Sequence, residues 1–549
     1  MLPHLQFMRG FKNMFGSCKQ TLTYFLRFVG PGFIVAVGYL DPGNWASDAE
    51  AGSQFGYKLL FIILLSNIMA IYLQYLAIRL GTVSGLDLSQ ACRKFLPRWL
   101  NFVLYLLCEA AIVSCDLAEV IGSAIALNLL FNLALPIGVA ITGLDVLIIL
   151  AFYKDDTKSL RIVRLFEVFV MILVLTVGIC FTIELVYSKP VGVDVLKGYL
   201  PSRDIFTDSS MLYVAISIIG ATVMPHNLYL HSSLVQARCG NWKNTRPSLH
   251  DAIDIKQSQD ALDSDIKRHL RYSFWDLFIA LLFAFFVNSA ILIVFSANFY
   301  SASSQHVVGD LFEAHALLQQ YLGSAAAVIF ALALLCSGQS STLTATLAGQ
   351  IIMSGFLGMT SRPWLRRLVT RLIAIVPAMI AAAVSGKEGL SNMLIASQVA
   401  LSIQLPFAVI PLVIFTGMKR VMTISVYKDE ESPKRLDSEI ADNNSDDDNS
   451  KSFKSGKSTN IGSRPASMIQ HTNEHALEMD IMTVPSKESN NIVKPTGTIS
   501  ELEEIGIQEL EPLLYINNRI TNVASAIVSL IIVGLNAYLV VTLFMGTSG

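Results

Sequence analysis

The 549-residue sequence contains little charge. Only 15% of its residues are Asp, Glu, Lys or Arg, while 53% are hydrophobic, and the mean hydropathy is +0.53. A soluble chain of this length needs far more charge on its surface. The sequence also lacks a basic patch with interleaved aromatic residues, so we expect no nucleic-acid partner. The shortage of charge indicates a membrane protein, and we expect the lipid bilayer to be one of its partners.

Cysteine pairs and catalytic motifs are missing as well. The seven cysteines include no C-x-x-C pair, so a structural zinc site is not expected. In the topology predicted below, none of them falls in an outside loop, and we expect no disulfide framework. No nucleophile–base pair or nucleotide-binding motif is present, and no cleavable signal opens the chain. We therefore expect neither an enzyme nor a bound cofactor.

Long apolar runs are abundant. Several approach the roughly 20 residues that cross a bilayer as a helix, so we predict an all-α polytopic membrane protein. The predicted spans are 24–54, 57–80, 100–131, 135–153, 163–187, 210–239, 273–298, 324–355, 366–385, 390–417 and 519–545.

The distribution of basic residues orients these spans. With a cytoplasmic N-terminus, only five of the 40 basic residues fall in outside loops, and cytoplasmic loops are the ones that carry excess Lys and Arg. The five are Lys58, Lys189, Lys197, Arg203 and Lys387. We therefore predict a cytoplasmic N-terminus and a short non-cytoplasmic tail.

Composition divides the chain into four parts. Residues 1–21 form a cytoplasmic N-terminal arm, 22–418 a ten-span transporter core, 419–516 a cytoplasmic linker, and 517–549 the eleventh span with its tail. The stretch 420–515 is rich in Ser, Asn, Asp and Lys, which predicts disorder. It is either a tolerated tether or a segment that binds regulatory partners.

Two prolines interrupt apolar spans at corresponding places. Asp41-Pro42-Gly43-Asn44 lies in the first span and Met224-Pro225-His226-Asn227 in the sixth. Proline removes a backbone donor, so we expect both helices to unwind, the first one resuming at Trp45. Paired breaks in two sets of five spans predict a 5+5 inverted repeat with a central site at the breaks.

The residues at the breaks predict a metal site. Asp41 and Asn44 offer hard oxygen ligands, and unwinding would free the carbonyl of Ala221. The sulfur of Met224 is soft and favours transition metals, so the set suits Mn²⁺, Fe²⁺, Co²⁺ or Cd²⁺. The alternatives are that Asp41 caps the resumed helix and that Met224 only packs.

A second group of ionisable residues predicts a proton pathway. Asp116 and Glu119 share a face of the third span, and His226 titrates near neutral pH. Arg238 and Arg371 could neutralise the acids. Acids and histidines inside membranes often carry protons, although a buried structural ion-pair cluster is the alternative.

Polar residues in two later spans have simpler interpretations. Gln398 in the tenth span could reach the central site on closure, or could bond a neighbouring helix. The small residues of 338–350 in the eighth span are explained by close helix packing. No lysine follows these glycines as it would in a phosphate loop.

Four stretches together resemble a known family. Asp41–Asn44, Asp116–Glu119, Met224–Asn227 and Gly338–Gln350 are similar, in order and spacing, to the motifs of the natural resistance-associated macrophage protein (Nramp) family of proton-coupled divalent metal transporters. The resemblance covers about residues 22–418 and is greatest for the fungal vacuolar branch. It implies a vacuolar or endosomal membrane, with the plasma membrane as the alternative.

The resemblance also implies a fold and roles for residues. The fold would be LeuT-like, with discontinuous helices 1 and 6 and the metal between them. Asp41, Asn44, Met224 and the Ala221 carbonyl match the family's metal ligands, and Gln398 matches a residue that joins on occlusion. The matches to proton-pathway positions are His226, Asp116, Glu119, Arg238 and Arg371.

The expected function is proton-coupled import of Mn²⁺ or Fe²⁺ into the cytosol by alternating access. Manganese, iron and protons are then transported substrates. Two other functions fit the same sequence. One is an amino-acid or organic-cation symporter of the same fold, in which Asp41 pairs with an ammonium group. The other is a metal sensor that does not transport and signals through 420–515.

Overall fold

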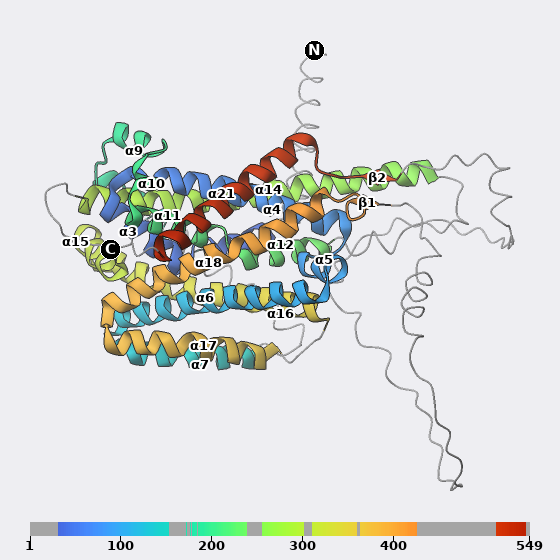
Figure 1. Cartoon of the computed structure of the whole chain (residues 1–549). Coiled ribbons are helices and arrows are strands. Elements are labelled where there is room, and N and C mark those ends of the chain that lie inside the picture. Colours follow the sequence, from blue (N-terminus) through green and yellow to red (C-terminus); the bar gives the residue numbers. More distant parts are fainter. Residues whose placement is uncertain are drawn as a thin grey trace, which may run out of the picture. The chain divides into compact units, whose positions relative to one another are not determined.

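The computed structural model describes residues 31–152, 185–238, 255–300, 310–358, 363–424 and 512–544, with scattered residues between 172 and 183. This part is almost entirely helical, as the sequence predicts (Figure 1). The N-terminal arm 1–21, more than half of the predicted fifth span and the linker from 425 to 511 lie outside the described residues.

Most predicted spans correspond to observed helices. Seven of the described helices, or helix pairs, are long and apolar enough to cross a membrane. The helices at predicted spans are α2 (Pro31–Gly38), α3 (Pro42–Phe55), α4 (Leu60–Arg79), α6 (Arg98–Phe131), α7 (Leu135–Phe152), α11 (Ser209–Thr222), α12 (Pro225–Arg238), α14 (Ile255–Phe299), α16 (Ser324–Leu357), α17 (Pro363–Val384), α18 (Gly386–Gly417) and α21 (Arg519–Phe544).

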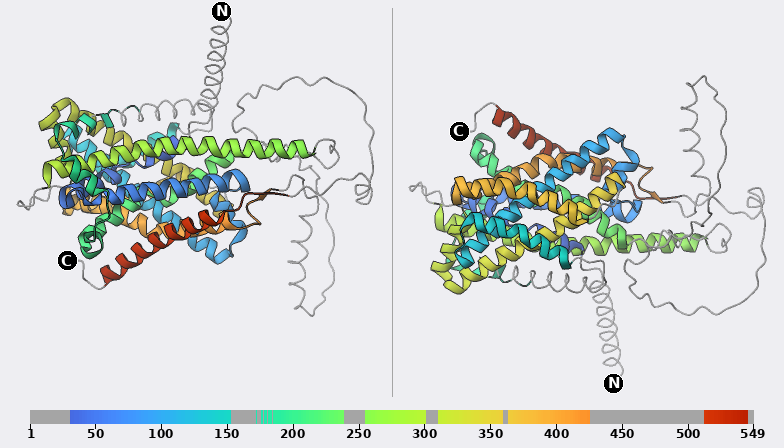
Figure 2. Two further views of the ribbon diagram at one scale, coloured as in Figure 1. Left: turned by 90° about the horizontal axis from the view of Figure 1, so that it is seen from above. Right: turned by 90° about the horizontal axis from the view of Figure 1, so that it is seen from below.

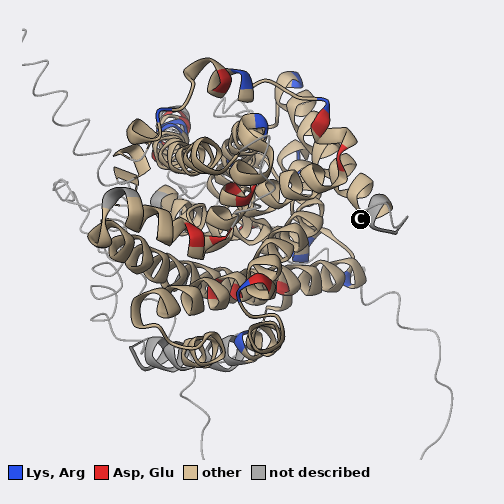
Figure 3. Ribbon diagram, turned by 90° about the vertical axis from the view of Figure 1, so that its left-hand side faces the viewer, with Lys and Arg blue, Asp and Glu red and all other residues tan. Residues whose placement is uncertain are grey.

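Short elements connect them. They are η1 (Gly56–Leu59), η2 (Leu80–Ser84), α5 (Leu88–Phe95), α9 (Gly192–Gly198), α10 (Asp204–Thr207), α15 (Leu311–Leu322), β1 (Thr423–Ile424) and β2 (Leu513–Leu514). Figure 3 shows that charged residues are sparse along the ribbon. The apolar side chains that remain exposed on the long helices are those expected to meet lipid.

The helix α14 is longer than predicted. The sequence predicts a span over 273–298 and, separately, a short amphipathic helix within 240–272, but residues 255–299 form one 45-residue helix. This stretch contains no Pro or Gly to end the helix. Its polar turns carry ion pairs between residues three or four apart, Lys267 with Asp263 and Arg268 with Asp265. Helix formation therefore continues after the apolar character ends.

Both predicted helix breaks are present. Residues 39–41 separate α2 from α3, and Val223 and Met224 separate α11 from α12. The prediction that the first helix resumes at Trp45 is wrong, because α3 already begins at Pro42. The first position of a helix needs no N–H donor and accepts the fixed φ of proline. Proline therefore starts the second half of each interrupted helix rather than lying in the unwound segment.

The long helices pack in two groups. In one, α6 lies beside α16 and α7 beside α17; in the other, α14 packs against α2, α3 and α4, and α11 against α3 and α4. The views of Figure 2 agree with this arrangement. The helix α18 contacts both α6 and α11 and so joins the groups. Both interrupted helices are consequently enclosed by other helices, and the residues at their breaks are buried.

A small polar cluster anchors the start of the last helix. The strands β1 and β2 pair antiparallel, so residues on either side of the segment 425–511 are held together. The guanidinium of Arg79, at the end of α4, donates to Asn517 Oδ1 and to the carbonyl of Tyr515. Asn517 Nδ2 donates to Thr416 Oγ1 of α18 at 3.0 Å. The chain entering α21 is thus fixed to α4 and α18.

We predict that Asn517→Ala lowers the thermal stability of the protein. Asn517 is 6% exposed, and its loss leaves the buried Arg79 and Thr416 without these bonds, at a cost of about 1–3 kcal/mol. Thermal unfolding in detergent should show a melting temperature several degrees lower. Arg519→Ala, an exposed change two residues away, is the control. Equal melting temperatures for the two variants would contradict the anchoring role.

Candidate metal-binding site

Asp41 occupies the N-cap position of α3. Its Oδ1 accepts the backbone N–H of Asn44 at 2.9 Å and the side-chain amide of Asn44 at 2.7 Å. The carboxylate is fully buried, and its Oδ2 has no hydrogen-bond partner among the described residues. Helix capping therefore accounts for the hydrogen bonds of only one oxygen of Asp41, Oδ1. The other oxygen is an unsatisfied buried acceptor, which is costly unless a cation or proton meets it.

The side chain of Asn44 connects the two breaks. Its Nδ2 donates to Asp41 Oδ1 and also, at 3.0 Å, to the carbonyl oxygen of Ala221. Ala221 lies in the last turn of α11, where carbonyl groups lose their helical partners. Two of the predicted ligands thus lie within reach of one amide group. A cation with oxygen ligands would replace this amide N–H₂ between the same two acceptors.

Met224 lies in the second break, between α11 and α12. Its Sδ accepts a weak hydrogen bond from Asn227 Nδ2 at 3.5 Å. A Cβ added at Gly38 would lie 3.7 Å from the sulfur, so the thioether packs beside the last residue of α2. Gly38 is only three residues before Asp41. The thioether of Met224, which is 1% exposed, therefore lies beside the end of α2, next to the break that contains Asp41.

Gln398 of α18 fills the space between the two interrupted helices. A Cβ at Gly43 would lie 2.0 Å from Gln398 Nε2, and a Cβ at Gly220 would lie 2.0 Å from the Gln398 carbonyl oxygen. Both glycines are required by this close approach. Gln398 Oε1 is buried without a hydrogen-bond partner among the described residues. The structure places the side-chain amide of Gln398 against the start of α3, with Nε2 the atom nearest Gly43.

Two polar residues that the sequence analysis did not single out support the unwound backbone. Ser337 of α16 donates to the carbonyl of Leu40 at 2.6 Å, and Asn288 of α14 donates to the carbonyl of Tyr39 at 3.4 Å. Unpaired carbonyls inside a membrane are expensive. Ser337 and Asn288 therefore stabilise the break, and their only sequence signal is a polar residue within an apolar run.

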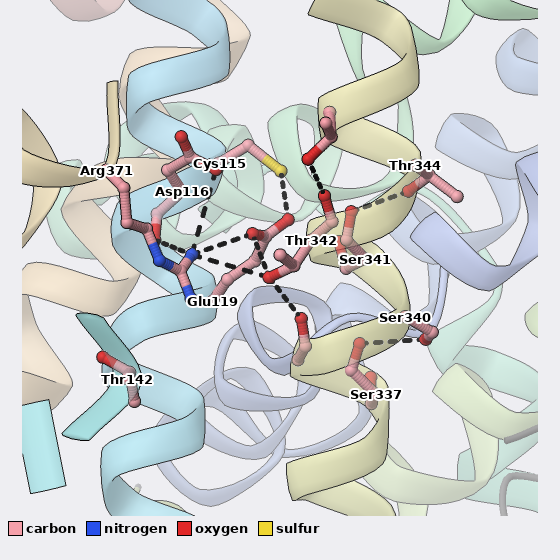
Figure 4. Close-up of polar contacts among 12 residues, drawn as sticks. Cys115, Asp116, Glu119, Thr142, Ser337, Ser340, Ser341, Thr342, Thr344 and Arg371 are labelled. Carbon is pink, nitrogen blue, oxygen red and sulfur yellow. Dashed lines mark hydrogen bonds and ion pairs between the residues drawn. The ribbon is translucent and has the colours of Figure 1, made fainter. Parts of the chain in front are cut away.

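The predicted acidic pair lies beside a buried arginine (Figure 4). Arg371 Nη1 of α17 is 3.2 Å from Glu119 Oε2 and 3.9 Å from Asp116 Oδ1. Thr342 Oγ1 of α16 donates to Glu119 Oε2 at 2.6 Å, and Cys115 Sγ lies 3.5 Å from Glu119 Oε1. All three charged residues are at most 1% exposed. One arginine and two carboxyl groups make a site that can gain one proton and become neutral.

Thr342 changes the interpretation of the eighth span. The sequence analysis explained residues 338–350 by packing alone, and this is incomplete. Gly338 does permit close approach, since a Cβ there would be 2.6 Å from Ser123 Oγ. Thr342, however, bonds to Glu119 across the helix interface. A threonine in an apolar helix gives the same sequence signal whether it bonds its own backbone or another helix.

The structure separates the two remaining proton-pathway candidates. His226 is 2% exposed in the first turn of α12, and its Nδ1 has no hydrogen-bond partner among the described residues. Arg238 is the last residue of the same helix. Twelve residues correspond to about 18 Å along a helix. The side chain of Arg238 lies outside the described residues, and its backbone is remote from the acidic pair.

No group of three His, Cys, Asp or Glu side chains that could hold a metal occurs in the described part of the chain. A resident zinc or iron centre built from such residues is therefore not found there. The arrangement around Asp41 has one carboxylate, amide and carbonyl oxygens and one thioether. Because only one of these ligands is anionic, the set would bind a divalent cation weakly enough to release it again.

We predict that Gly220→Ala disrupts the site. The new methyl group would overlap the carbonyl oxygen of Gln398 and lie 2.7 Å from the backbone nitrogen of Ser402, and overpacking of this kind costs about 1–3 kcal/mol. The melting temperature in detergent should fall by several degrees. Gly534→Ala is the control, because a Cβ there meets nothing within 4 Å. Indistinguishable melting temperatures for the two variants would show that α11 and α18 are not closely packed here.

Comparison with known proteins identifies relatives over most of the chain. The family model described as natural resistance-associated macrophage protein-like matches residues 32–428. A divalent metal cation transporter, MntH, of Nostoc sp. is 52% identical over 398 residues, covering 72% of this chain and 84% of the relative. The iron transporter SMF3 of Saccharomyces cerevisiae is 46% identical, covering 74% and 85%. Its manganese transporter SMF1 is also 46% identical, covering 74% and 73%.

A solved structure shares the fold. The crystal structure of the Eremococcus coleocola manganese transporter matches with 36% identity and a TM-score of 0.60, covering 73% of this chain and 81% of that one. The family model ends at residue 428, before most of the polar segment.

Proposed function

Because the chain belongs to the natural resistance-associated macrophage protein family, we propose that it imports Mn²⁺ or Fe²⁺, and also Co²⁺ and Cd²⁺, into the cytosol together with protons. The observation that carries this proposal is the amide of Asn44 between Asp41 Oδ1 and the Ala221 carbonyl. Two oxygens held this close, inside the membrane and beside a thioether, suit a small dication better than an amino acid.

In this proposal the ion is bound by Asp41, Asn44, the Ala221 carbonyl and Met224. The amide of Asn44 turns so that its oxygen, rather than its N–H₂, faces the ion. The unpaired Oδ2 of Asp41 is then satisfied as well. Gln398, whose side-chain amide lies against the start of α3, joins the ion through its Oε1 as the site closes. The thioether favours transition metals over Ca²⁺ and Mg²⁺.

The proton pathway uses the other group of helices. Asp116, Glu119 and Arg371 form a buried cluster with room for one proton, and His226, buried in the first turn of α12, is the next group in the proposed pathway. An arriving dication repels a proton held near Asp41 towards His226 and the acids. A negative interior then favours inward movement of both cations by about 2.3 kcal/mol per charge per 100 mV.

Alternating access follows from the interrupted helices. Each half-helix ends at the site, so the halves can tilt independently and open one side at a time. Two sets of five spans around these breaks remain our proposal for the repeat. The N-terminus is cytoplasmic, and the membrane is vacuolar or endosomal. The segment 420–515 binds regulatory partners on the cytoplasmic side, and its fixed ends could transmit their effect to α4 and α18.

We predict that Met224→Ala weakens the selection against calcium. The thioether sulfur stabilises bound transition metals but contributes little to the binding of hard cations such as Ca²⁺. Its loss therefore weakens the binding of Mn²⁺ or Cd²⁺ more than that of Ca²⁺. In proteoliposomes, Ca²⁺ should compete with Mn²⁺ or Cd²⁺ uptake at a concentration roughly tenfold lower, the equivalent of about 1.4 kcal/mol. Met211→Ala, which removes another buried methionine of the same interrupted helix, is the control.

The same assay distinguishes the competing functions. Unchanged calcium competition in Met224→Ala would argue against a sulfur ligand. Uptake of labelled amino acids, with no uptake of labelled metal, would favour an amino-acid symporter of the same fold. Removal of 425–511 should leave metal uptake intact in a transporter, whereas a metal sensor would lose its output.

We predict that Glu119→Gln separates metal movement from proton movement. The amide keeps a group that can bond Thr342 and Arg371 but cannot take up a proton. Metal-driven acidification of liposomes should fall roughly tenfold, a change worth about 1.4 kcal/mol, while Mn²⁺ uptake down its gradient continues. Glu109→Gln on the same helix is the control. Unchanged acidification in Glu119→Gln would remove this residue from the proton pathway.

A further inference from the structure

An apolar crevice opens between the last helix and the core. It has a volume of about 690 Å³ and is walled by α4, α10, α11 and α21. Cavities of about 300–1,000 Å³ are typical of ligand sites. The crevice is separate from the metal site and from the acidic cluster, and nothing in the proposed transport mechanism uses it.

The crevice spans one leaflet. It is lined from Tyr538 to Leu530 along α21, from Phe61 to Leu65 along α4, and by Leu212 and Ile216 of α11. Eight residues of helix cover about 12 Å, less than half of the roughly 30 Å hydrocarbon core. The end at α10 faces the side that the predicted orientation makes non-cytoplasmic.

The wall formed by α21 is open to the bilayer. In both views of Figure 2, α21 (red) lies at the edge of the bundle and at an angle to its neighbours. Leu530 is 74% exposed and Tyr538 47%. Gly534 leaves a gap in this wall, since a Cβ there would meet nothing within 4 Å. An occupant can therefore enter sideways from lipid.

The end of the crevice at α10 is polar. Lys58 Nζ donates to Asp204 Oδ2 at 2.6 Å, and both side chains are about half exposed. Lys58 precedes the lining residue Phe61 by one turn, and Asp204 adjoins the lining residue Ile205. Tyr538 OH donates to the carbonyl of Phe206 at 3.4 Å. An apolar shaft that ends at an ammonium–carboxylate pair matches an acyl chain below a zwitterionic head group, whose phosphate would face Lys58 and whose quaternary ammonium would face Asp204.

We propose that this crevice binds one acyl chain of a membrane phospholipid, with the lipid phosphate beside Lys58. A sterol would fill the shaft but would offer a hydroxyl group rather than an anion to the ammonium group. The chain would bury apolar surface of α4, α11 and α21 together, each buried CH₂ contributing favourably to binding.

The position of the crevice links this lipid to the metal site. Its α11 wall continues to Ala221 and Thr222, and Ser66, next to the lining residue Leu65, donates to Thr222 Oγ1 at 3.3 Å. A bound chain would support α11 against α4. This consequence rests on the proposed transport function, but binding of the lipid does not.

The test is photolabelling of the full-length protein in nanodiscs. The probe is a phosphatidylcholine with a diazirine in one acyl chain, and labelled peptides are identified by mass spectrometry. Wild-type protein should be labelled on α11 and α21 at the crevice. Gly534→Phe, which fills the crevice, should reduce this labelling roughly tenfold, equivalent to about 1.4 kcal/mol. Val533→Phe, on the adjacent residue that does not line the crevice, should leave labelling unchanged.

Several results would overturn the proposal. One is equal labelling of Gly534→Phe and Val533→Phe. Another is labelling of the crevice by a diazirine sterol but not by the phospholipid probe. Lys58→Gln should reduce phospholipid labelling, and an unchanged yield would contradict the phosphate contact. If Gly534→Phe does not yield monodisperse protein, Gly534→Leu gives the same comparison with a smaller group. None of these readouts depends on metal transport.

Discussion

The two hydrogen bonds from the amide of Asn44 tie the interrupted helices together. Unwound backbone inside a bilayer needs partners for its carbonyl groups, and the rest of the core supplies them. Ser337 reaches Leu40, Asn288 reaches Tyr39, and Asn44 itself reaches Ala221. The helices that carry these side chains surround the breaks for this reason. Glycines at the interfaces then allow Gln398 and Pro42 to approach closely enough to fill the remaining space.

Charge inside the protein obeys the same constraint in the neighbouring group of helices. Arg371 would be very costly alone in an apolar interior, and so would either carboxylate. Placed together, they leave a single excess negative charge that a proton can neutralise. Because His226 belongs to α12, which begins at the second break, the proposed proton pathway and the proposed metal site share one structural element. A movement of α12 therefore acts on both sites at once.

The sequence predicted the two helix breaks better than the side chains that support them. Proline within an apolar run located both breaks, and Asp41 and Met224 stood out because polar or soft groups are rare there. The starting point of α3 was missed because proline favours the first turn of a helix rather than the coil before it. Thr342 and Ser337 were missed for another reason. Thr346 and Thr344, in the same helix, bond their own backbone, and nothing local distinguishes these cases. The length of α14 was underestimated because residues 255–272 are polar but still favour a helix, so the helix extends beyond the apolar span.

The arrangement of the amide also explains how a buried carboxylate is held ready for a cation. A bare Asp41 would repel other acceptors such as the Ala221 carbonyl, and the site would tend to open or to stay protonated. The N–H₂ of Asn44 bonds both acceptors and keeps them at the separation that an ion needs. When the amide turns, those two bonds are lost and its own oxygen becomes a ligand. In the proposed site, binding would exchange internal hydrogen bonds for coordination, which keeps the gain in free energy moderate. A transported ion must be released again on the other side, and a site of this kind permits it.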